Sequence, residues 1–62
     1  MGPSNEHESE IARVVDRVSS ERRLDLSRID EIIARLSFIM TRSDSEFLVK
    51  YMRWRIDNPV MN

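Results

Sequence analysis

The chain has 62 residues, enough for one small domain with a marginal hydrophobic core. Ten basic and eleven acidic residues nearly cancel, so the net positive charge that drives non-specific nucleic-acid binding is absent. The chain has no cysteine and a single histidine, His7, which excludes disulfides, thiolate metal sites and a zinc site built from histidines. Self-association or a partner is therefore expected to supply part of its stability.

The sequence shows no segment of the kind that targets or anchors a protein. No apolar run approaches the ~20 residues of a membrane span, and no stretch resembles the apolar region of a signal peptide. We therefore expect a cytoplasmic protein that does not bind membranes. Gly2 and Pro3 indicate that residues 1–5 form a disordered tail, followed by a single helical domain over residues 6–58 and a short C-terminal tail over residues 59–62.

A first helix is predicted from about Glu6 to Arg22 or Arg23. Asn5 and Glu8 resemble a capping box at its start, and His7, among glutamates, is expected to be solvated. The apolar stripe is narrow and mostly β-branched, so this helix should depend on tertiary contacts and is expected to cover the other helices only in part. The stripe consists of Ile11, Val14, Val15 and Val18.

A second helix is predicted from Leu26 to about Thr41, because apolar residues recur at spacings of three and four. Asp25 is the preferred N-cap, with Ser27 as the alternative, since Asp25 keeps Leu26 on the apolar seam. The predicted seam consists of Leu26, Ile29, Ile33, Leu36 and Met40, and it is widened by Ile32 and Ile39.

A third helix is predicted from about Asp44 to Asp57. Ser43 and Glu46 fit the capping box S-x-x-E directly before an apolar run, and Asn58-Pro59 should end the helix. Its apolar set consists of Phe47, Leu48, Tyr51, Met52, Trp54 and Ile56. No run alternates apolar and polar residues, so no strand is expected.

These elements predict an all-α fold: a small three-helix unit whose second and third helices form a hairpin, in a homodimeric helical bundle. Apolar residues also recur every seven positions at Met40, Phe47, Trp54 and Met61. One continuous helix over the second and third segments therefore remains an alternative. We prefer the hairpin, because the capping box restarts the helix.

The sequence offers no constellation typical of a catalytic, metal or cofactor site. There is no glycine after Gly2, which excludes a glycine-rich phosphate loop, and no serine lies in a G-x-S-x-G context. Asp30 and Glu31 are adjacent, so their carboxylates point about 100° apart on a helix. The stretch 44–46 lacks the glycine and spacing of a calcium loop. We expect neither enzyme activity nor a cofactor.

Protein binding is the function that the residues favour: an oligomerisation domain, or a small regulator that docks a larger protein through an apolar helical face. The expected partners are a second copy of the chain and a larger protein. Aromatic residues, Met and Arg are enriched at interfaces and their hot spots. The predicted apolar anchors are Ile33, Leu36, Met40, Phe47, Tyr51 and Trp54, with Arg35, Arg53 and Arg55 as charges at the rim.

Nucleic-acid binding is the alternative. The second and third predicted helices are joined by a short break, as in a helix-turn-helix protein. The basic third helix would then be the second helix of that motif. Against this, the turn lacks glycine, the chain is nearly neutral, and Trp54 lies on the apolar seam. The residues expected to contact phosphates are Arg42, Lys50, Arg53 and Arg55.

Overall fold

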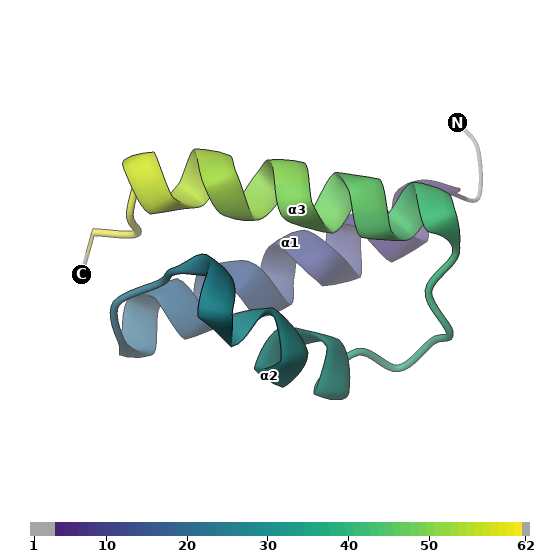
Figure 1. Ribbon diagram of the computed structural model, residues 1–62, viewed down its shortest axis with the longest axis horizontal. Coiled ribbons are helices and arrows are strands. Elements are labelled where there is room, and N and C mark those ends of the chain that lie inside the picture. Colours follow the sequence, from purple (N-terminus) through teal and green to yellow (C-terminus); the bar gives the residue numbers. More distant parts are fainter. Residues whose placement is uncertain (1–3, 62) are drawn as a thin grey trace.

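The computed structural model describes residues 4–61, which fold into three α-helices and one short 3-10 helix (Figure 1). Helix α1 spans Ser4–Glu21, the 3-10 helix η1 spans Leu26–Arg28, α2 spans Ile29–Ala34 and α3 spans Arg42–Asp57. No strand occurs among residues 4–61, so the all-α prediction is confirmed. None of these helices is long and apolar enough to cross a membrane.

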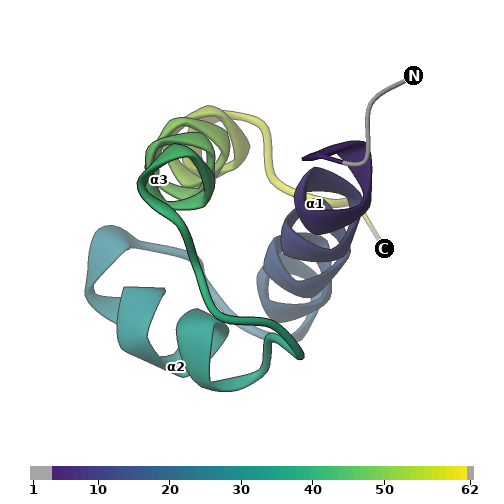
Figure 2. The same ribbon diagram turned by 90° about the vertical axis from the view of Figure 1, so that its right-hand side faces the viewer.

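The three helices surround one core. Helices α1 and α3 lie side by side and run in the same direction, while α2 runs in the opposite direction (Figure 1). Seen end-on, the helices stand at the corners of a triangle (Figure 2). Helix α3 packs chiefly against α1 although α2 separates them in the chain. The first helix is therefore the main support of the third.

Each helix contributes its own stripe to the core, which lies inside the triangle. The narrow α1 stripe is central, because three of its β-branched residues are fully buried. Half-buried residues, Phe38 and Ile56 among them, pack around this centre. The buried hydrophobic residues within the described range are Ile11, Val15, Val18, Leu24, Ile32, Leu48 and Met52.

Helix α1 begins at Ser4, two residues before the predicted start, and ends at Glu21. Asn5 therefore lies inside the helix and is not its N-cap. Of the predicted disordered tail, residues 1–3 lie outside the described residues.

The second predicted helix is much shorter than its apolar pattern indicates. Asp25 is its N-cap, as predicted, and its carboxylate accepts a bond of 2.9 Å from the backbone N–H of Ser27. The helix ends at Ala34 and not at Thr41. The reason is tertiary: the backbone N–H and hydroxyl of Ser37 both donate to the carboxylate of Glu10 on α1, at 2.7 and 2.8 Å.

Helix α3 begins two residues before the predicted start because a different capping box forms. Thr41 is the N-cap: its hydroxyl accepts from the backbone N–H of Asp44 at 3.1 Å, and the Asp44 carboxylate accepts from the N–H of Thr41 at 2.9 Å. The predicted Ser43–Glu46 box is wrong. The helix ends at Asp57, before Asn58 and Pro59, as predicted. Residues 35–41 break the helix, so the continuous-helix alternative is excluded.

Candidate functional site

The predicted interface residues do not form one patch. Four of them are half-buried and pack against the core, where they support the fold. Two of the predicted anchors are more exposed: Ile33 keeps 40% of its surface and Trp54 keeps 50%. Two of the three arginines, Arg35 and Arg55, are bonded within the chain. The half-buried residues are Leu36, Met40, Phe47 and Tyr51.

Arg55 ties α3 to α1 and is not free to bind a partner. Its Nε donates to Asp16 Oδ1 at 2.9 Å, and the Tyr51 hydroxyl donates to the same oxygen at 2.8 Å. Arg55 also donates from Nη2 to the Tyr51 oxygen at 3.0 Å and from Nη1 to the carbonyl of Asn58 at 2.8 Å. The hydrogen bond with Tyr51 raises the pKa of Arg55, and burial raises the pKa of Tyr51. Within the fold Arg55 therefore acts as a structural clamp.

Trp54 lies beside this clamp, outside the core. The guanidinium carbon of Arg55 stands 4.4 Å from the centre of its ring, and the Tyr51 ring lies 5.6 Å away at a tilt of 41°. A cation over an indole face is a stabilising arrangement. One side of the indole is thus occupied by the protein, while half of its surface remains available.

Arg35 joins α2 to the end of α1. Its Nη2 donates to Glu31 Oε2 at 3.0 Å, four residues earlier, and its Nη1 lies 3.6 Å from Glu21 Oε1 on α1. Glu31 also lies 3.7 Å from Arg22 and 3.5 Å from Arg28. These exposed pairs individually stabilise little, and their main effect is to set which side of α2 faces α1.

The opposite side of α2 carries exposed apolar residues. Ile32 is fully buried, and the 100° step between successive residues places Ile33 on the side of Ile32 away from Arg35. Leu26, at the start of η1, is 41% exposed and precedes Ile33 by seven residues, a spacing of about two helical turns that puts both near the same side. Because Arg35 marks the side that contacts α1, Leu26 and Ile33 lie on the side away from α1.

Helix α3 is oriented by its contacts with α1. Tyr51 and Arg55 bond to Asp16 and so mark the side of α3 that contacts α1. Leu48 is fully buried. Val49 is rotated from Leu48 by 100° about the helix axis, in the direction away from Tyr51. Val49 belongs to a shallow hollow on this side of the helix. The hollow is lined by Arg42, Ser45, Glu46, Val49, Lys50 and Arg53.

The two sides turned away from α1 belong to one face of the molecule, because the helices stand in a triangle (Figure 2). We call it the α2–α3 face. It combines exposed apolar residues with cations, and the side chains of Lys50 and Arg53 have no partner within the described chain. The face also brings together three of the four residues that were predicted to contact phosphates, whereas the fourth, Arg55, lies elsewhere. The α2–α3 face consists of Leu26, Ile33, Arg42, Val49, Lys50 and Arg53.

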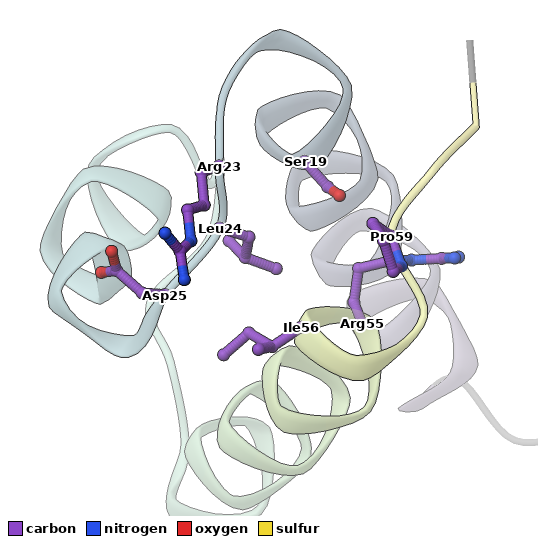
Figure 3. Close-up of a pocket in the computed structure, with 7 residues that line it drawn as sticks. All are labelled: Ser19, Arg23, Leu24, Asp25, Arg55, Ile56 and Pro59. Atoms are coloured by element: carbon purple, nitrogen blue, oxygen red, sulfur yellow. The ribbon is translucent and has the colours of Figure 1, made fainter.

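A second hollow lies where α1 and α3 end (Figure 3). Arg23 and Asp25 stand on one side of it, and Arg55 and Pro59 on the other. The hydroxyl of Ser19 accepts a bond of 3.3 Å from the N–H of Val60, so the C-terminal tail contacts α1 and not only α3. Nowhere in residues 4–61 do three potential metal ligands gather.

His7 is the contact that the sequence did not predict. It is not simply solvated: its side chain is 39% exposed, its Nδ1 lies 3.0 Å from Asp44 Oδ2, and its ring stacks on Phe38 at 3.8 Å between centroids. These contacts join α1 to α3 and to the connection between α2 and α3. His7 and Asp44 are 37 residues apart, so no local spacing could have indicated the pair.

Comparisons with known protein families, with curated proteins and with solved structures found no match.

Proposed function

We propose that the protein is a non-enzymatic interaction module that forms a homodimer through the α2–α3 face. The observation that carries the proposal is that two exposed apolar residues, Leu26 on η1 and Ile33 on α2, and the hollow around Val49 on α3 lie on the side that α1 leaves uncovered. Apolar side chains left exposed on one face are typical of interaction sites. In the proposed bundle, α2 and α3 act as a helical hairpin whose outer side meets the partner, and the module works in the cytoplasm.

The small size of the domain favours further burial of apolar surface at an interface. A chain of 62 residues has a marginal core, and burying apolar surface contributes about 25 cal/mol per Å². Ile33 is the central anchor, and Arg53 lies at the rim, where charges govern orientation and rate. Trp54, on the other side of α3, would stay exposed in the dimer and is the residue we assign to docking a larger protein.

Sedimentation equilibrium over micromolar to millimolar concentration tests the proposal. We expect the wild-type chain to dimerise with increasing concentration. Ile33→Asp should remain helical and monomeric, because an ionised carboxylate would be buried without a partner. Trp54→Ala is the matched control, since it removes a larger exposed apolar side chain outside the face and should leave the dimer intact. A monomeric wild type, or a dimer indifferent to Ile33→Asp, would refute the proposal.

Nucleic-acid binding remains a second candidate for one reason: Arg42, Lys50 and Arg53 line one hollow. Glu46 in the same hollow and the engagement of Arg55 with Asp16 weaken it. Reversing Lys50 and Arg53 to Glu together should abolish binding to mixed-sequence DNA or RNA at low salt. Absence of any such binding by the wild type removes this candidate.

A further inference from the structure

The charges along the outer side of α3 follow a self-complementary order. Arg42, Glu46, Val49, Arg53 and Asp57 are spaced by three or four residues and so share one side of the helix. Arg42 and Asp57 lie equally far from the midpoint of α3, between Val49 and Lys50, and carry opposite charges. Glu46 and Arg53 also carry opposite charges and lie equally far from the midpoint, but closer to it.

We propose that a second copy of this chain occupies the α2–α3 face, with the two α3 helices packed antiparallel about a two-fold axis at the midpoint of α3. This inference rests on the proposed function and specifies its partner and register. In this register Arg42 faces Asp57 of the second copy, and Glu46 faces Arg53 of the second copy. The symmetry repeats each pair, as in any isologous interface.

The shape of α3 fits such a partner. The six residues that line the hollow occupy positions i, i+3, i+4, i+7, i+8 and i+11 along the helix. They form two adjoining holes of four residues each, the surface into which a side chain of a facing helix inserts. The second hole is centred on the midpoint of α3, so Val49 of the second copy enters it in the proposed register. This hole is formed by Glu46, Val49, Lys50 and Arg53.

Helix α2 can take part in the same two-fold arrangement. It runs opposite to α3 and lies beneath its middle part (Figure 1). In a dimer whose axis also crosses the middle of the η1–α2 segment, Leu26 of one copy meets Ile33 of the other. Asp30 is exposed and lies between Leu26 and Ile33 in the sequence. In the dimer it would approach Asp30 of the second copy. Asp30→Asn should therefore tighten the dimer by removing a like-charge contact.

The free charges of α3 favour a second copy over a polyanion. The side chains of Arg53 and Asp57 have no partner within the described residues, and the contact of Glu46 with Arg42 is loose, at 3.7 Å. The stripe of Arg42, Glu46, Arg53 and Asp57 carries two positive and two negative charges and is matched by its own inverted copy, while Lys50 adds one further cation at its edge. A nucleic acid would leave both carboxylates facing phosphates.

A charge swap tests the register. Arg53→Glu alone and Glu46→Arg alone each place like charges opposite one another, twice by symmetry, and should weaken the dimer at least about tenfold in sedimentation equilibrium. The double variant Glu46→Arg with Arg53→Glu exchanges the two charges and should restore an affinity close to wild type. Arg17→Glu, an exposed reversal on α1, is the control and should have no effect.

The outcomes separate the two proposals. If Ile33→Asp breaks the dimer while the single reversals leave it unchanged, or if the double variant fails to recover, the register is wrong and the proposed function stands. A wild type that is monomeric at every concentration overturns both the register and the proposed function. This holds even if the monomer binds an acidic helix or RNA. A second measurement checks the axis: Val49→Cys should form disulfide-linked dimers on mild oxidation, whereas Trp54→Cys should not. The reverse pattern overturns the register.

Discussion

His7 and Asp44 join the beginnings of two parallel helices, with 3.0 Å between Nδ1 and Oδ2. Asp44 also closes the capping box of α3 by accepting from the backbone N–H of Thr41. The Thr41 bond, and then the bond with His7, hold the pKa of Asp44 below its ordinary value of 3.8. The carboxylate of Asp44 therefore both caps the start of α3 and joins α3 to α1.

This arrangement predicts a loss of stability in acid. A carboxyl group whose pKa is lowered by folding stabilises the native state above its unfolded-state pKa, and this contribution is lost as the pH falls through the lowered folded-state pKa. Asp44→Asn should lower the melting temperature at pH 7 and flatten its decline below pH ~4. Circular dichroism melts across this range measure it, with the exposed Glu6→Gln as control. An unchanged pH profile in Asp44→Asn would contradict the role.

The start of α3 can be tested by two neighbouring hydroxyls. Thr41→Ala removes the N-cap and should reduce the free energy of unfolding by about 1 kcal/mol, which lowers the melting temperature by about 4–8 °C in a domain of this size. Ser43→Ala, at the position that the sequence favoured, should change it by less than about 0.5 kcal/mol. Equal effects of the two substitutions would refute the observed cap.

Adjacent isoleucines on α2 should behave differently. Ile32 is fully buried, so Ile32→Ala should reduce the free energy of unfolding by about 2–5 kcal/mol, enough to unfold much of this small domain. Ile33→Ala should cost less than about 1 kcal/mol when measured in dilute solution, where the chain is monomeric. Urea titrations followed by circular dichroism give both values. If Ile33→Ala proved the more damaging, the orientation of α2 would be wrong.

Tyr51 reports directly on the clamp between α3 and α1. It is the only tyrosine in the chain, so absorbance of the phenolate titrates this residue alone. Burial, with a smaller contribution from Asp16, raises its pKa above the ordinary value of 10.0. Asp16→Asn should move the pKa back towards that value. A wild-type midpoint at or below 10.0, in protein that circular dichroism shows to be folded, would contradict the buried position.

Local patterns were sufficient for the helical fold, the Asp25 cap and the end of α3 at Asp57. They failed where contacts distant in sequence compete with them. The bonds from Ser37 to Glu10 end the second helix early, although its apolar spacing continues to Met40. The side of α2 that faces the core carries Ile32 and not Ile33.

The candidate site was predictable only in part. Arg53 and Lys50 lie on an open side of α3, as an interface or phosphate contact requires, but Arg55 does not. Arg55 and Arg53 are two residues apart and so about 200° apart around the helix. Which of the two faces α1 depends on Asp16, 39 residues earlier, and no spacing within α3 reveals it.

The most direct test of the central claim is a dilution series of the ¹⁵N-labelled chain followed by ¹H–¹⁵N correlation NMR. If copies meet through the α2–α3 face, dilution should shift the amide signals of Ile33, Val49 and Arg53, while those of Arg13 and Arg17 on the outer side of α1 stay in place. Signals that do not depend on concentration, or shifts confined to Trp54 and the outer side of α1, would contradict the account.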